Sequence, residues 1–361
     1  MIQPLHISYF AVLLDGPESG ASKKVLSQFE TWVDSGIGAS LYVIVLKKDL
    51  KLWNFPGDVF VYPEGKGFLK LLVRYKVLKC LLKKSPEVIY MRDSFPFPLL
   101  NNLKTSKLIL EVQTLFFQEL ESRSRLKWAI AKIFDKYYLN KFSGFIFVSR
   151  EISYSSRFTK YLLSGNSAVI SNGIRLDKFN TLKVSKTNQS IELIFVGQDG
   201  QKWHGVEQII SLANQAPDYI FHLVGIAPNQ YESPGNVKFY GKLPFSDYKL
   251  LAERCVAAFG TLNISAKKMT EASPLKVREY LALGLPVIIR YSDTDFMDKS
   301  DFILNLPHDN RDLKDFVIEI RNFCETWQGR RVPQDLVREI DMQGKENQRL
   351  AFFRKVHDYK S

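Results

Sequence analysis

The segment TEASPLKVREYLALGLPVII (270–289) joins the pattern of a helix directly to the pattern of a buried strand. Apolar residues recur with helical spacing from Ala272 to Leu283, and Gly284 ends the helix. The run LPVII that follows has the apolar, β-branched composition of a strand buried on both faces. A helix followed so closely by such a strand predicts an α/β fold with a parallel sheet.

The same alternation of short apolar runs and longer periodic segments extends in both directions from this segment. It predicts a first set of strands at 5–13, 41–46, 87–91, 107–111 and 144–148, and a second set at 167–171, 191–197, 219–225, 236–241, 256–260 and 285–290. We therefore expect two Rossmann-like domains, residues 1–165 and 166–345, facing across a cleft. Ligands of open parallel sheets bind beyond the carboxyl ends of the strands, so this cleft is the expected active site.

Charge is distributed unevenly along the 361 residues, whose net charge is +12. Residues 1–165 contain 24 Lys and Arg against 14 Asp and Glu, whereas the remaining 196 contain 26 against 24. The first domain is thus expected to meet an anionic partner, such as phospholipid, nucleic acid or a phosphorylated substrate. The three cysteines have no metal-site spacing and suit a reducing cytoplasm. We expect neither a signal peptide nor a membrane-spanning helix.

The start of the helix in 270–289 carries the groups that a diphosphate would need. Ser273 and Pro274 lie in the expected first turn, where backbone N–H groups and the positive end of the helix dipole are available. Glu271 precedes this turn and can face the same ligand. Glu279 lies two turns further along and can accept hydrogen bonds from vicinal hydroxyls such as those of a ribose. The alternative interpretation is an amphipathic helix with two surface glutamates.

This segment resembles the glutamate-x7-glutamate element of retaining glycosyltransferases of family four, in an S-P-L-K variant. Other segments match elements of that family in the same order: FIFVSREI (145–152), VISNGIRLDKF (169–179), LIFVGQDGQKWHGVEQII (193–210) and VKFYGKLPFSDYKLLAERCVAAF (237–259). The resemblance covers the second half well. It continues more weakly into the first half, where YMRDSFPFPLLNNLKTSKLILEVQ (90–113) resembles the strand–helix–strand on the acceptor side.

The resemblance implies a GT-B fold and transfer of a hexose from a UDP-sugar, with retention at the anomeric carbon. Glucose is the hexose that we expect first. It also implies that residues 346–361 form a helix returning to the first domain. Glu271 would orient the sugar and Glu279 would hold the ribose. Lys276 and the turn Ser273–Leu275 would stabilise the leaving diphosphate. The remaining donor-binding positions are Gly20 in the first turn, Gly197, Pro274 and Leu275 at the phosphates, and Gly241, Lys242 and Leu243 at the base.

Several positions depart from the family pattern. Many relatives carry an Arg and a Lys around the phosphate turn, where this sequence has Gln198 and His204. Lys202 and Lys276 are the candidate replacements for those cations. Relatives often place a histidine after the strand 107–111, whereas this chain has Gln113, which could hydrogen-bond the donor sugar.

Asp293-Thr294-Asp295 spells a D-x-D, which binds manganese in another glycosyltransferase fold. It follows the strand 285–290 in a loop that we expect to lie remote from the phosphate helix. We interpret it as a loop with turn-forming aspartates and expect no metal and no cofactor beyond the donor.

The segments 68–84 and 124–142 are basic and apolar at helical spacing, with Trp128 as an interfacial anchor. Such helices dock on anionic bilayers, although their apolar faces can instead cover a sheet while their lysines are solvated. We expect a cytoplasmic protein, peripheral on the inner face of the plasma membrane, that acts on a lipid-linked saccharide in bacterial surface polysaccharide synthesis. No nucleic-acid recognition motif accompanies the charge. Two alternatives remain: a sugar-nucleotide epimerase of the same fold, and a non-catalytic nucleotide-sugar sensor.

Overall fold

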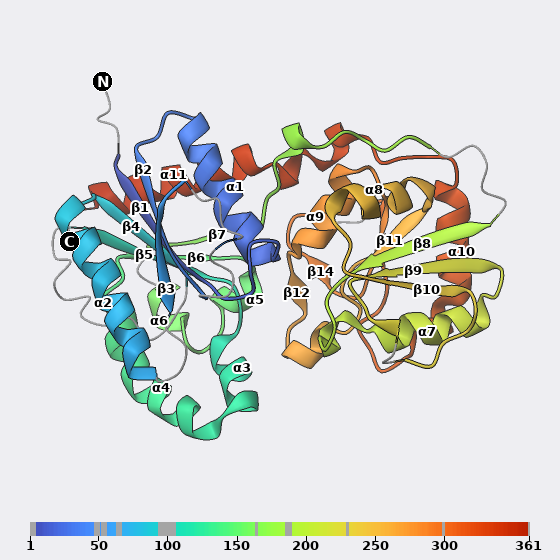
Figure 1. Ribbon diagram of the computed structural model, residues 1–361, viewed down its shortest axis with the longest axis horizontal. Coiled ribbons are helices and arrows are strands. Elements are labelled where there is room, and N and C mark those ends of the chain that lie inside the picture. Colours follow the sequence, from blue (N-terminus) through green and yellow to red (C-terminus); the bar gives the residue numbers. More distant parts are fainter. Residues whose placement is uncertain are drawn as a thin grey trace. The chain divides into compact units, whose positions relative to one another are not determined.

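The computed structural model describes residues 5–46, 51, 56–62, 67–92, 106–162, 165–184, 190–228, 231–297 and 300–359. It divides into two compact units, one formed by Met1–Gly173 with Met342–Ser361 and the other by Ile174–Asp341 (Figure 1). Each unit is a parallel sheet covered by helices, which confirms the predicted α/β class. The boundaries fall later than the predicted 165 and earlier than the predicted 345.

The first unit contains a seven-stranded parallel sheet with the order β3-β2-β1-β4-β5-β6-β7. Its strands are β1 (Ile7–Leu13), β2 (Ala39–Leu46), β3 (Asp58–Tyr62), β4 (Val88–Arg92), β5 (Lys107–Val112), β6 (Gly144–Phe147) and β7 (Ser167–Val169). The prediction that 167–171 opens the second domain is wrong, because β7 pairs with β6. The edge strand β3 was not predicted. It is only half buried and too short for a clear alternation.

Seven helices accompany this sheet among the described residues. They are α1 (Gly20–Asp34), α2 (Gly67–Lys84), α3 (Phe116–Arg123), α4 (Arg125–Leu139), α5 (Arg150–Ser153), α6 (Thr159–Leu162) and α11 (Met342–Asp358). Of the predicted acceptor-side stretch 90–113, residues 93–105 lie outside the described residues. The flanking strands β4 and β5 were predicted closely.

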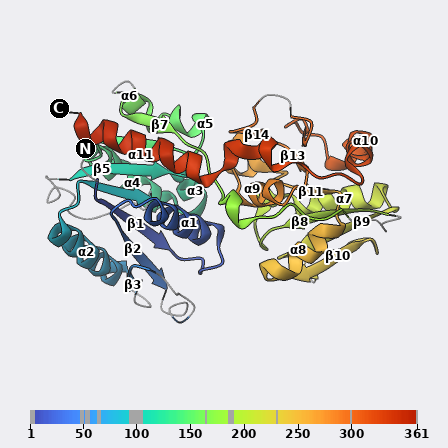
Figure 2. The same ribbon diagram turned by 90° about the horizontal axis from the view of Figure 1, so that it is seen from above.

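The C-terminal helix α11 belongs to the first unit, as the resemblance implied, and crosses its sheet (Figure 2). Trp32 of α1 and Phe353 of α11 pack edge-on at 5.9 Å between ring centroids, and Tyr9 and Tyr90 of the sheet complete the aromatic cluster. Buried Glu346 accepts a hydrogen bond of 2.8 Å from the Trp32 indole. The helix therefore closes one face of the first sheet although it lies far away in the sequence.

The second unit contains a six-stranded parallel sheet with the order β10-β9-β8-β11-β13-β15, and a separate pair, β12-β14. The strands are β8 (Ile191–Val196), β9 (Tyr219–Val224), β10 (Val237–Gly241), β11 (Ala257–Phe259), β12 (Glu271–Ala272), β13 (Val287–Ile289), β14 (Ser292–Asp293) and β15 (Ile303–Asn305). The main helices are α7 (Val206–Gln215), α8 (Phe245–Arg254), α9 (Leu275–Ala282) and α10 (Val317–Trp327). Leu193, Phe221 and Phe259 from the strands pack with Ile209 and Ile320 from helices in one core.

Candidate functional site

Two glycines bring the carboxyl ends of β8 and β9 into close contact. A Cβ at Gly197 would lie 2.4 Å from the ring of Phe195 and 2.8 Å from Nδ1 of His204. Gly225 has a φ of +81°, and a Cβ there would lie 2.0 Å from the Gly197 carbonyl oxygen. Neither position therefore tolerates a side chain without movement of backbone or buried rings. We call this meeting of Gly197 and Gly225 the glycine turn.

Helix α9 is anchored at the end of β8. The backbone N–H of Val196 donates a 2.7 Å hydrogen bond to the Tyr280 hydroxyl. One turn earlier on the same helix, Nζ of Lys276 lies 4.1 Å from the centroid of the Phe195 ring. Lys276 and Tyr280 are four residues apart and so lie on the same face of α9. This face, at the first turn of the helix, packs against the end of β8 beside the glycine turn.

The Lys276 ammonium group is buried, although part of its aliphatic stem remains accessible. Among the described residues, Nζ has no hydrogen-bond partner. Burial lowers the pKa of Lys276 from 10.5 to about 7. A buried cation without a counterion is costly, so its presence favours a site that an anion completes.

The first turn of α9 adds backbone donors to this cation. Pro274 is the N-cap, with φ −70° and ψ 135°, and it has no side-chain cap hydrogen bond. Leu275 follows as the first helical residue. Exposed N–H groups and the dipole at such a helix start attract anions. The structure thus brings Gly197, Pro274, Leu275 and Lys276 together as predicted.

His204 adds no positive charge to this site. Its Nδ1 accepts a 3.4 Å hydrogen bond from the backbone N–H of Gln198. Burial, together with the nearby Lys276, lowers the pKa of His204 to about 3. Lys202 begins the short 3-10 helix Lys202–His204 and is exposed, as is the Gln198 side chain. Of the two lysines predicted as replacement cations, only Lys276 is buried at the glycine turn.

Glu279 is held by a residue that sequence reasoning missed. The Tyr248 hydroxyl of α8 donates a 2.7 Å hydrogen bond to Oε2 of Glu279. Burial and this carboxylate both raise the pKa of Tyr248. The half-buried Glu279 is therefore fixed in position, and its other oxygen can still accept hydrogen bonds. The only signal for Tyr248 in the sequence was its place in the segment 237–259, which resembles an element of family four.

The D-x-D loop packs against the phosphate helix, so the prediction that it lies remote from that helix is wrong. The short parallel pair β12–β14 joins Glu271 to Ser292, which brings the loop back to α9. Buried Arg278 of α9 then donates hydrogen bonds of 2.9 Å to Asp293 and 2.7 Å to Asp295.

Arg278 thereby uses both carboxylates of the D-x-D and also donates to the Ser273 hydroxyl, at 3.0 Å. The buried guanidinium is therefore paired and hydrogen-bonded, as a buried charge requires, and it occupies both carboxylates. Ser273 contributes its side chain to this network. Within the described ranges, no three His, Cys, Asp or Glu side chains cluster in a way that could hold a metal.

The chain resembles solved structures over its full length. It matches a glycosyltransferase from Rickettsia africae at TM-score 0.69 and 11% identity, covering 98% of this chain and 100% of that one. It matches sucrose-phosphate synthase from Thermosynechococcus elongatus at TM-score 0.67 and 13% identity, covering 97% of this chain and 99% of that one. It matches HepE from Anabaena, solved in complex with UDP-glucose, at TM-score 0.60 and 14% identity, covering 97% of this chain and 98% of that one. The fold is GT-B. No family model matches the chain, and no curated protein matches it by sequence.

In this GT-B fold, the predicted base-binding positions lie at the end of β10. Gly241 has a φ of +59°, and its carbonyl accepts a hydrogen bond from the Gly225 N–H. Lys242 is exposed and Leu243 is half buried. These residues therefore lie beside the glycine turn at the ends of neighbouring strands, and their contact with a base stays a prediction.

The predicted residues of the first GT-B unit have their own local partners. Gly20 is the first residue of α1, behind the N-cap Ser19. The Gln113 amide nitrogen is buried and has no hydrogen-bond partner among the described residues. Glu111 pairs with Lys24 at 2.8 Å. Burial acts to raise the pKa of Glu111, but nearby cations outweigh it and hold the pKa at about 2. Glu111 is thus a permanently charged structural group.

Proposed function

We propose that this chain is a glycosyltransferase that uses a nucleotide-sugar donor bound by the unit Ile174–Asp341. One observation carries the proposal: the buried Lys276 ammonium, at the start of α9 and beside the glycine turn after β8, has no hydrogen-bond partner among the residues that the structure describes. A donor diphosphate supplies the negative charge that this position lacks. Cations and helix starts aimed at a leaving diphosphate stabilise the charge that develops during glycosyl transfer.

The remaining site residues are assigned to separate parts of the donor. Glu279, oriented by the Tyr248 hydroxyl, is assigned to the ribose hydroxyls. Glu271, in β12, is assigned to the transferred sugar, and retention at the anomeric carbon is part of the proposal. The main-chain N–H groups of Leu275 and Lys276 are assigned to the diphosphate. The Arg278 network keeps the turn before α9 in place while the donor binds.

We further propose UDP as the nucleotide and glucose as the first sugar to test. The resemblance to family four favours a UDP-sugar, and one similar structure was solved with UDP-glucose. The proposed acceptor is a lipid-linked or polysaccharide chain in bacterial surface polysaccharide synthesis. The basic first unit, with 24 Lys and Arg against 14 Asp and Glu in residues 1–165, supports an anionic acceptor or surface.

Peripheral docking on the inner face of the plasma membrane belongs to the same proposal. Helix α2 exposes Lys76, Lys79, Lys83 and Lys84, and α4 exposes large apolar side chains beside its lysines. No helix within the described part of the chain is long and apolar enough to cross a membrane. Basic helices with exposed apolar residues bind anionic interfaces instead.

One observation favours a second candidate, a nucleotide-sugar sensor without turnover. His204 is held neutral, and Gln198 is exposed, at the two positions where relatives carry cations. Two experiments separate the candidates. Calorimetric titration with UDP- and GDP-sugars identifies the donor, and release of free nucleotide from it, with or without acceptor, measures turnover. Binding without any turnover would favour the sensor, and absence of binding to every nucleotide sugar would refute both.

A further inference from the structure

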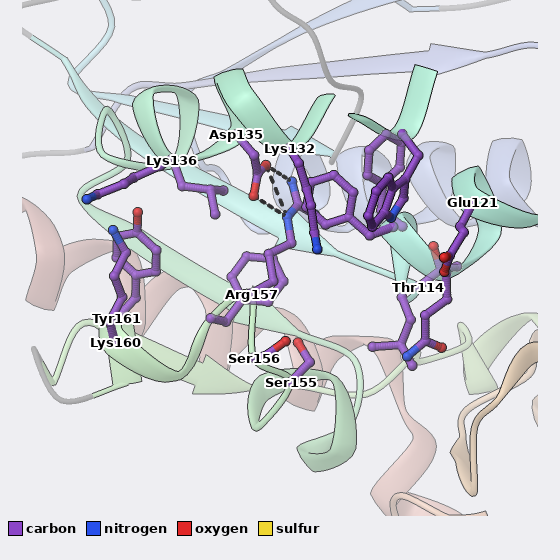
Figure 3. Close-up of a pocket in the computed structure, with 17 residues that line it drawn as sticks. Thr114, Glu121, Lys132, Asp135, Lys136, Ser155, Ser156, Arg157, Lys160 and Tyr161 are labelled. Carbon is purple, nitrogen blue, oxygen red and sulfur yellow. Dashed lines mark hydrogen bonds and ion pairs between the residues drawn. The ribbon is translucent and has the colours of Figure 1, made fainter. Parts of the chain in front are cut away.

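A cavity of about 620 Å³ lies within the first unit, between α3, α4 and the segment 155–161 (Figure 3). This volume is within the roughly 300–1,000 Å³ typical of small-molecule sites. Thr114 and Leu115, which follow β5, form part of its lining. The cavity is thus at the edge of the sheet where the carboxyl ends of parallel strands place ligands.

The walls of this cavity are aromatic and rigid. Arg157 donates three hydrogen bonds of 2.7–3.1 Å to the carboxylate of Asp135, and both side chains are at least nine-tenths buried. The Arg157 guanidinium also lies 5.3, 5.0 and 4.9 Å from the ring centroids of Phe116, Phe117 and Phe158. Because Asp135 neutralises Arg157, this part of the lining is preorganised, stacked and without net charge.

Lysines surround this neutral aromatic lining. Lys132 and Lys136 of α4 are exposed, and Lys160 approaches from the other side. Figure 3 shows Arg157 directed at Asp135, with Lys132 extending alongside it and Lys136 and Lys160 at the other end of the cavity. Lys132 lies 4.3 Å from the centroid of the Trp128 ring, which holds the ammonium near the cavity. Against these three cations the lining contains one acidic side chain outside the Arg157 pair, Glu121. The opening therefore attracts an anion.

The exposed face of α4 beside these lysines is apolar. Its exposed large residues recur at helical spacing and are 49–74% accessible: Leu126, Ile130, Ile133, Phe134 and Tyr137. A helix that covers a sheet normally exposes polar residues on its outer face. This helix thus places lysines between an apolar exterior and an aromatic cavity, as contact with an amphiphile requires.

We propose that this cavity binds a phosphate-bearing amphiphile, namely the lipid phosphate end of the acceptor. Lys132 holds the phosphate, Lys136 and Lys160 add positive charge at the other end of the cavity, and the first part of the apolar chain packs among Phe117, Trp128 and Leu139. The assignment as acceptor rests on the proposed glycosyl transfer, whereas binding of the amphiphile does not. The exposed stripe of α4 contacts the bilayer from which the lipid enters.

The test uses the full chain and decyl phosphate, below its critical micelle concentration, as probe in calorimetric titration. We expect one site per chain and no comparable binding of inorganic phosphate or of decyl maltoside. Changing Lys132→Ala and Lys136→Ala together should weaken binding by about tenfold or more, since hydrogen bonds to charged groups are lost. The matched control, Lys183→Ala with Lys314→Ala in the unit Ile174–Asp341, removes the same charge from exposed positions and should change binding by less than about twofold.

A second variant keeps the test decisive if the double lysine variant misfolds. Ser156 lines the cavity and is exposed, so Ser156→Trp narrows the opening without burying a polar group. It should abolish decyl phosphate binding and leave UDP binding unchanged. Equal binding of inorganic phosphate would show a simple anion site and overturn the proposal. Insensitivity to both the lysine pair and Ser156→Trp would also overturn it.

The outcomes keep the two proposals separate. Decyl phosphate binding by a chain that never binds or turns over a nucleotide sugar would refute the glycosyltransferase and leave the cavity assignment intact. Turnover of a nucleotide sugar by a chain that does not bind decyl phosphate would refute the cavity assignment alone.

Discussion

Replacement of Lys276 by methionine tests the central argument directly, because the change removes the charge and keeps the shape of the side chain. Burial lowers the pKa of Lys276 from 10.5 to about 7, so the ligand-free protein carries an unfavourable cation. One pKa unit corresponds to about 1.4 kcal/mol. At pH 7 the shift sets an upper limit of about 4 kcal/mol on that cost. We expect Lys276→Met to stabilise the ligand-free chain by about 1–4 kcal/mol.

The pH dependence gives this expectation a sign. Between pH 7 and 10.5 the unfolded chain holds a proton on Lys276 that the folded chain has lost. The contribution of Lys276 to the free energy of unfolding therefore rises with pH across this window. The stability difference between Lys276→Met and wild type should be greatest below pH 7 and disappear above pH 10.5. Denaturant unfolding at several pH values measures it.

Donor binding should change in the opposite direction. The diphosphate supplies the charge-assisted hydrogen bonds that the buried ammonium lacks. Lys276→Met should therefore weaken UDP binding by about 1.5–3 kcal/mol, or roughly ten- to a hundredfold. Wild-type binding near pH 8 should also take up protons, which calorimetry in buffers of different ionisation enthalpy detects. Lys202→Met, at an exposed position close in sequence, should cost less than about 1 kcal/mol. A Lys276→Met variant that binds UDP like wild type would refute the reasoning.

Three further expectations concern the rest of the site and the first unit. Glu279→Ala should mainly weaken binding of UDP and donor, by about 1.5–3 kcal/mol, whereas Glu271→Ala should spare UDP binding and lower turnover strongly. Calorimetry and steady-state kinetics on both variants decide this, and the reverse pattern would contradict the assignment. Transfer activity should survive chelation with EDTA, since Arg278 engages both aspartates of the D-x-D, and loss restored by manganese would count against it. Binding of the chain to phosphatidylglycerol vesicles in co-sedimentation should weaken as salt rises, because salt screens exposed lysines. Equal binding to neutral vesicles would argue against lysine-driven docking.

Local patterns were sufficient for the class of the fold and for the glycine that ends β8. Strands buried on both faces are continuous apolar runs in the sequence. Gly197 and Gly225 each directly follow such a run, at a position where only glycine fits, so both signals are local. The periodicity from Ala272 to Leu283 likewise placed α9 and its first turn. Edge strand β3 was not predicted, because a half-buried run of five residues has no distinct alternation of apolar and polar residues.

Tertiary structure alone decided which polar groups are free and which are paired. The sequence offered both Lys202 and Lys276 as candidate cations, but packing against Phe195 buries only one of them. It placed the D-x-D away from α9, whereas the pairing of β12 with β14 brings both aspartates to Arg278. Burial and pairing depend on residues distant along the chain, and no local pattern records them. Sequence therefore determined the fold and the candidate site residues. The structure determined that, within its described ranges, the Lys276 ammonium is buried without a hydrogen-bond partner.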